Sequence, residues 1–188
     1  MIFHVAEKAE KRRGKMNTKV LVILSLLVGI GTVLHTVIPG VFFGVKPDML
    51  LSMMFLGIIL FPQPKYVVLL ALATGAISAL TTQAPGGQIA NLIDKPITAM
   101  LFLILFLFVK NKVNNKISAP VLTAIGTMIS GAIFLSVVLF FLGAMEGGFI
   151  AGMLTVVLPA AAVNTLIMIV IYPVVEGILK RSQPITSL

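Results

Sequence analysis

The sequence contains no cysteine and no tryptophan, and only 11% of its 188 residues are charged. Without cysteine, a disulfide framework, a thiolate metal site and a thiol nucleophile are all excluded. Without tryptophan, an aromatic belt at a membrane surface would have to use tyrosine and phenylalanine. A soluble globular domain carries charge on about a quarter of its residues, so the shortage of charge argues against a soluble fold.

Motifs that supply energy or catalysis are missing as well. The chain has no GxxxxGK[ST] phosphate loop, so it cannot power itself with ATP. It has no HExxH motif, and its apolar segments hold no serine–histidine or carboxylate pair placed for hydrolysis. They also hold no series of acids and no inverted repeat of broken helices. We therefore expect a protein that is not an enzyme and that uses no cofactor or metal.

Long apolar segments dominate what is present. Hydrophobic residues make up 59% of the sequence, and the mean hydropathy is +1.12. A chain this small cannot hide so much apolar surface inside itself, so the surface must face lipid. Six apolar blocks are found, at about 19–38, 48–61, 66–82, 92–109, 119–142 and 149–179. They predict an all-α membrane protein, a compact bundle of six transmembrane helices, with a short second block and a sixth block distorted by its two prolines.

Basic residues are distributed unevenly along this arrangement. Twelve of the 14 lysines and arginines fall on one side of the six spans, and only Lys46 and Lys95 fall on the other. By the positive-inside rule both termini are cytoplasmic, with tails at 1–18 and 180–188 around a transmembrane domain at 19–179. Topology thus explains the net charge of +8 without nucleic acid, which we do not expect as a partner. Membrane lipid with anionic headgroups is the partner that these charges suit.

The opposite side of the bundle is rich in polar residues. Two predicted connections, 39–48 and 83–96, each hold an aspartate with a lysine beside it or two residues away. A zwitterionic amino acid needs such a pair, because an acid can bind its ammonium and a lysine or a helix N-terminus its carboxylate. Phenylalanines could flank its side chain, and amides could bind its polar atoms. The candidate substrate-binding residues are Phe42, Phe43, Lys46, Asp48, Gln83, Gln88, Asn91, Asp94, Lys95 and Asn164.

Structural roles compete with substrate binding at these positions. Asp48 and Asp94 stand where a helix N-cap or a first-turn acid would stand. Both lysines precede a proline, which predicts extended backbone, and a lysine at a helix end can also snorkel to the membrane surface. Asn164 must face the bundle, where it either contacts a ligand or ties two helices together. Glu176 is expected to pair with Lys180, one helical turn away.

Two stretches carry a resemblance to a known family. They are 44–49, Gly-Val-Lys-Pro-Asp-Met, and 83–96, which ends in Asn-Leu-Ile-Asp-Lys-Pro. With the six-span pattern, they make the chain similar to the substrate-binding S components of energy-coupling-factor (ECF) transporters, and more narrowly to the tryptophan-transport protein family of Firmicutes. The resemblance implies a bacterial plasma-membrane protein that captures tryptophan from outside. It also implies two kinds of partner, a transmembrane coupling subunit and two cytoplasmic ATPases that drive the uptake.

The resemblance leaves the docking surface and the mode of transport open. S components often dock through an AxxxA motif in the first helix, which this chain lacks. Ser25 and Gly29 have the same spacing and are the predicted docking residues. The alternative function is a stand-alone secondary permease for an amino acid, and a third is an assembly or sensory subunit without cargo. Uptake in cells that lack the coupling ATPases separates the first two.

Overall fold

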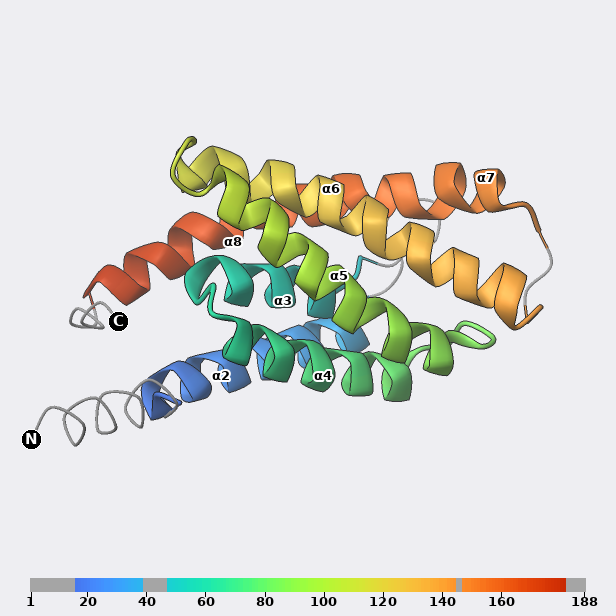
Figure 1. Cartoon of the computed structure of the whole chain (residues 1–188), viewed down its shortest axis with the longest axis horizontal. Coiled ribbons are helices and arrows are strands. Elements are labelled where there is room, and N and C mark those ends of the chain that lie inside the picture. Colours follow the sequence, from blue (N-terminus) through green and yellow to red (C-terminus); the bar gives the residue numbers. More distant parts are fainter. Residues whose placement is uncertain (1–15, 39–46, 145–146, 182–188) are drawn as a thin grey trace, which may run out of the picture.

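The computed structural model describes residues 16–38, 47–144 and 147–181, which form a bundle of packed helices (Figure 1). The helices are α2 (Thr18–Val37), α3 (Met49–Leu60), α4 (Pro64–Thr81), α5 (Gly87–Val109), α6 (Asn115–Ser136), α7 (Phe149–Gly152) and α8 (Leu158–Arg181). Two π-helical segments, η1 (Val137–Phe141) and η2 (Met153–Val157), continue α6 and join α7 to α8. These residues contain no β-strand, so the all-α prediction is confirmed for them.

Five helical units are long and apolar enough to cross a membrane. They are α2, α4, α5, the α6–η1 unit and the α7–η2–α8 unit. Between 22% and 44% of the residues in their apolar windows are buried, which leaves most of each helix to face lipid. The sixth predicted block corresponds to the last of these units, and the second corresponds to α3, which has 12 residues.

Helix α3 lies in the middle of the bundle, with the other helices around it (Figure 1). All of its residues from Met49 to Ile59 are buried. An apolar helix of this length is typical of a buried core helix, because a helix enclosed by protein need not match the thickness of the bilayer. Its Phe55 ring stacks on that of Phe102 in α5, with 4.1 Å between the ring centroids. The core is therefore built around α3 and positions α5 against it.

The second outer connection is much shorter than the predicted loop at 83–96. The chain leaves α4 at Thr82, and α5 already begins at Gly87, after Gly86 in the left-handed conformation with φ 71°. The prediction of a loop was wrong because Asn91, Asp94 and Lys95, polar residues of this stretch, lie on the buried side of a helix. Pro96 is inside α5, so Lys95 does not have the extended backbone that its position before a proline predicted.

Close packing holds the first half of α5 against α4. A Cβ at Gly75 would lie 3.3 Å from the backbone oxygen of Asn91 and 3.5 Å from the Cβ of Lys95. A glycine at this position therefore lets the two helices approach closely. This contact fixes the place of Lys95 inside the bundle.

The sixth block is distorted at one of its two prolines. The π-helical segment η2 ends at Val157, two residues before Pro159. A proline removes a backbone hydrogen bond and its ring crowds the preceding turn, and a wider π turn there relieves both effects. Pro173 lies within α8, which continues through it to Arg181.

Candidate functional site

Asp48 begins helix α3. Its Oδ1 accepts a hydrogen bond of 2.9 Å from the backbone N–H of Leu51, so the N-cap interpretation is confirmed for this aspartate. Its other oxygen, Oδ2, accepts from the Nζ of Lys95 at 2.8 Å. The side chain is 25% exposed, and the Nδ1 of His35 in α2 lies 3.8 Å from Oδ1. Asp48 thus caps one helix and pairs with another.

Asp94 lies inside α5 and is fully buried, so the N-cap interpretation was wrong for this residue. Three donors surround its carboxylate. Its Oδ1 accepts from the Oγ1 of Thr98 at 2.7 Å, and its Oδ2 accepts from the Oγ of Ser130 in α6 at 2.6 Å. The Nζ of Lys95 completes the set at 3.0 Å from Oδ2. A buried charge held this way is fully hydrogen-bonded and has little freedom to move.

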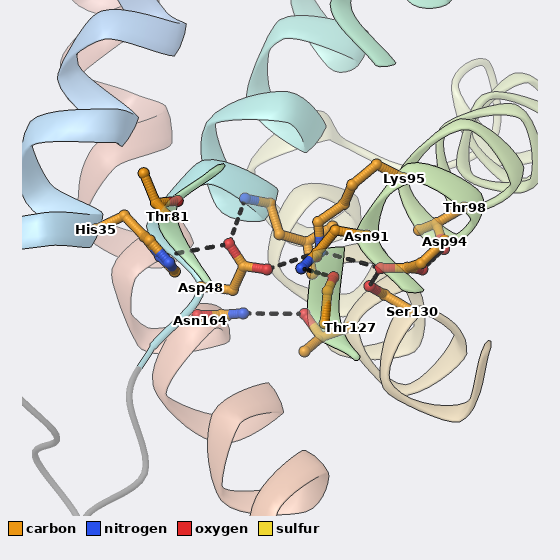
Figure 2. Close-up of polar contacts among 12 residues, drawn as sticks. His35, Asp48, Thr81, Asn91, Asp94, Lys95, Thr98, Thr127, Ser130 and Asn164 are labelled. Carbon is orange, nitrogen blue, oxygen red and sulfur yellow. Dashed lines mark hydrogen bonds and ion pairs between the residues drawn. The ribbon is translucent and has the colours of Figure 1, made fainter. Parts of the chain in front are cut away.

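Lys95 joins the two aspartates, and Figure 2 shows its ammonium between their carboxylates. Its side chain is 3% exposed, so it does not snorkel to the membrane surface as one interpretation predicted. Burial of charged groups such as Asp94 and Lys95 in a membrane bundle is expensive unless they are paired, and such residues usually serve function. We call Asp48, Asp94 and Lys95 the charge cluster. Its two negative charges and one positive charge give a formal charge of −1, His35 not included.

The two buried asparagines play different structural parts. The Nδ2 of Asn91 donates to the backbone oxygen of Gly87 at 2.8 Å, one turn earlier in α5. The Nδ2 of Asn164 in α8 donates to the Oγ1 of Thr127 in α6 at 3.3 Å, which confirms the predicted tie between two helices. The Oδ1 of Asn164 is buried without a hydrogen-bond partner in the described part of the chain. Figure 2 shows the Asn164–Thr127 pair below Asp48 in that view.

Other candidate residues lie apart from the charge cluster or outside the described residues. Gln83 and Gln88 have exposed side chains, on the connection and the first turn of α5. Phe42, Phe43 and Lys46 fall in 39–46, outside the described residues. At the other end of the bundle, Lys180 and Glu176 form the expected ion pair at 3.0 Å.

Sequence reasoning missed the hydroxyls that support the charge cluster. Thr98 and Ser130 both bind Asp94, and neither was a candidate. The position of Thr98, one turn after Asp94, was the only signal for it, whereas Ser130 comes from a different helix. Within the described residues, no group of three His, Cys, Asp or Glu side chains is arranged to hold a metal ion.

A groove between α2 and α4 opens on the outside of the bundle. Its volume is about 300 Å³. It contains both predicted docking residues, Ser25 and Gly29, opposite Ala73 and Ile77 of α4. A Cβ built on Gly29 would meet no atom within 4 Å. The two residues therefore lie together on an open surface.

These features define a class of protein before any comparison. Membrane-length helices that enclose a paired charge cluster are typical of membrane transport proteins, because ionisable groups inside a membrane usually mark a path or a binding site. The chain belongs to the family described as tryptophan transporter TrpP, whose model matches residues 17–180.

Three curated relatives cover nearly the whole chain. Each is named "Probable tryptophan transport protein". The protein from Bacillus subtilis is 53% identical over 168 residues, which cover 89% of this chain and 96% of the relative. Those from Clostridium acetobutylicum and Clostridium perfringens are 38% and 35% identical and cover 86% and 89% of this chain, and 94% and 96% of the relatives. No solved structure matches the chain.

Proposed function

We propose that this protein is the membrane-embedded substrate-binding (S) component of an ECF-type importer and that it captures tryptophan from outside the cell. Family membership and the names of the relatives support the substrate. The observation that carries the proposal is the charge cluster, in which Asp48 and Lys95 come from different elements and meet inside the bundle. Such a site supplies both charges that an amino acid requires.

Each group of the site has a proposed role. A carboxylate of the charge cluster binds the ammonium of tryptophan, and Lys95 binds its carboxylate. The Oδ1 of Asn164, a buried acceptor without a partner in the described residues, suits the indole N–H. Phe42, Phe43 and Lys46 lie two to six residues before Asp48 in sequence, so we keep them as proposed substrate contacts.

The distribution of basic residues supports the proposed orientation. Figure 1 shows the start of α2 and the end of α8 at the same end of the bundle as the connection between α5 and α6. Lys110, Lys112 and Lys116 at that connection are exposed, and Lys180 and Arg181 end α8. The positive-inside rule makes this end cytoplasmic. Asp48 caps the start of α3, which points away from this cytoplasmic end. The proposed site therefore lies nearer the outer surface.

Energy for uptake would come from partners. The chain has no phosphate loop, so we propose that a coupling subunit and two ATPases drive transport. The groove with Ser25 and Gly29 is the proposed docking surface, since small residues let a partner helix approach closely.

Ligand retention on the purified protein tests the capture of tryptophan. The chain has no tryptophan and only two tyrosines, so bound tryptophan dominates the fluorescence. Tryptophan is expected in the extract of the purified protein by mass spectrometry, and its absence together with a flat titration would refute the proposal.

A secondary permease is the second candidate, because buried charges also occur in ion-coupled transporters. Uptake of labelled tryptophan is compared in cells with and without the coupling ATPases. Loss of uptake without the ATPases is expected, and full concentrative uptake would favour the permease.

A further inference from the structure

The two carboxylates of the charge cluster differ in burial and in the number of hydrogen bonds that they accept from side chains. Asp94 is fully buried, and three donors at 2.6–3.0 Å use both of its oxygens. Asp48 is 25% exposed, and its Oδ2 accepts a hydrogen bond only from Lys95 among the contacts described. Asp94 is therefore a fixed partner of Lys95, and Asp48 is the partner that a ligand can reach.

The two ion pairs also differ in what must move to open them. Lys95 and Asp94 are neighbours in α5, so no movement of helices separates them. Lys95 and Asp48 lie 47 residues apart in sequence, on α5 and at the start of α3. A small separation of these two elements opens the second pair and leaves the first intact.

We propose that the substrate binds by opening the Lys95–Asp48 pair and placing its own two charges between the partners. The ammonium of tryptophan goes to the Oδ2 of Asp48, and its carboxylate goes to the Nζ of Lys95. Asp94 keeps Lys95 in place throughout, with Thr98 and Ser130 as positioning residues that act through Asp94. This inference rests on the proposed function and assigns a separate role to each charge of the cluster.

Electrostatics explains why the exchange selects a zwitterion. An amino acid is neutral overall, so every buried charge has a partner both before and after it binds. A ligand with only a carboxylate would pair with Lys95 and leave Asp48 unpaired in a medium of low dielectric. A ligand with only an ammonium would pair with Asp48 and leave Lys95 with Asp94 alone, so the charge-assisted bond between Lys95 and Asp48 would be lost without replacement. The cluster therefore disfavours indole compounds that lack the ammonium most strongly, and those that lack the carboxylate to a smaller extent.

Three ligands test the exchange on the unaltered protein. L-tryptophan carries both charges, tryptamine only the ammonium and indole-3-propionate only the carboxylate. In competition calorimetry, indole-3-propionate is expected to bind at least about 100-fold more weakly than tryptophan, and tryptamine at least about tenfold more weakly. If either ligand binds within about threefold of tryptophan, the exchange is wrong even though the proposed function stands. If tryptophan itself does not bind, the proposed function and the exchange both fall.

Asp48→Asn tests the role of the exchangeable carboxylate. Asparagine is as good an N-cap as aspartate, so the variant keeps the cap of α3 and removes only the charge. Tryptophan is expected to bind at least about tenfold more weakly, while indole-3-propionate binds more tightly because Lys95 is released from one of its two carboxylates. The preference for tryptophan over indole-3-propionate thus falls, and tryptamine gains nothing.

Glu176→Gln is the matched control, since Glu176 is 24% exposed and is also paired with a lysine, at the other end of the bundle. It is expected to leave all three affinities unchanged. An equal loss for all three ligands in Asp48→Asn would show that Asp48 serves the structure alone and would overturn the exchange.

Discussion

At the scale of single residues, the main feature is Lys95, which forms ion pairs with two carboxylates inside the bundle. Removing one member of a buried ion pair leaves its partner with an uncompensated charge, which costs about 3–5 kcal/mol. Replacing a whole pair by apolar residues is often neutral, so a buried pair is weak evidence for stability. Stability alone therefore does not account for the cluster of Asp48, Asp94 and Lys95, which is consistent with the ligand-binding role that we propose for it.

Removing charges of the cluster is expected to weaken substrate binding. Lys95→Ala and Asp94→Asn should each lower the affinity for tryptophan by about 1–3 kcal/mol in calorimetry, the scale of a charge-assisted hydrogen bond. Lys112→Ala is the control, because Lys112 is an exposed lysine on the connection between α5 and α6. Unchanged affinity in well-folded variants would mean that the charges serve only the structure.

The hydroxyl of Ser130 is expected to stabilise the protein through Asp94. Its Oγ donates at 2.6 Å to the buried carboxylate, so Ser130→Ala should lower the free energy of unfolding by about 1–3 kcal/mol. Ser136→Ala, also in α6, is the matched control. The Oγ of Ser136 donates only to the backbone oxygen of Ala132 at 2.7 Å. Equal shifts of the unfolding temperature in detergent would contradict the role of Ser130.

At the scale of elements, the sequence predicted which segments are helical better than it predicted where each helix begins and ends. Blocks of apolar residues located each helical unit, because a helix that faces lipid must carry a long run of apolar residues. The start of α5 was missed, since Asn91, Asp94 and Lys95 are polar but point inward. The contact of Asp94 with Thr98 follows from their spacing of one turn once α5 is known to begin at Gly87. The contact with Ser130 depends on how α5 packs against α6, and a single sequence carries no direct signal of that packing.

Helix α2 offers a test of docking that leaves the binding site intact. A side chain at Gly29 meets no neighbouring atom, so Gly29→Leu should fold normally and fill the groove between α2 and α4. Tryptophan binding is expected to be unchanged, while uptake and co-purification with the coupling subunit fall by at least about tenfold, because a close helix contact is lost.

Gly177→Leu in α8 is the matched control, since Gly177 also has open space around it. Its uptake should equal that of the unaltered protein. If Gly29→Leu supports full uptake as well, the groove does not dock the coupling subunit.

At the scale of the whole molecule, the ends of the bundle differ in charge. The exposed lysines described at the connection between α5 and α6 share one end with the last turn of α8. Toward the other end, the lysine at the charge cluster is buried and paired with two acids. A charge gradient of this kind orients a membrane protein as it inserts. The same orientation is required for a site that captures its substrate from outside.

Single cysteines test this orientation directly, because the chain has none of its own. Pro85 is exposed between α4 and α5, and Lys112 is exposed between α5 and α6. In intact cells, a membrane-impermeant maleimide is expected to label Pro85→Cys at once and Lys112→Cys only after permeabilisation. The reversed labelling pattern would mean that the binding site faces the cytoplasm. Tryptophan binding by the purified protein would then survive, but capture from outside would not, so the labelling separates the chemistry of the site from the direction of transport.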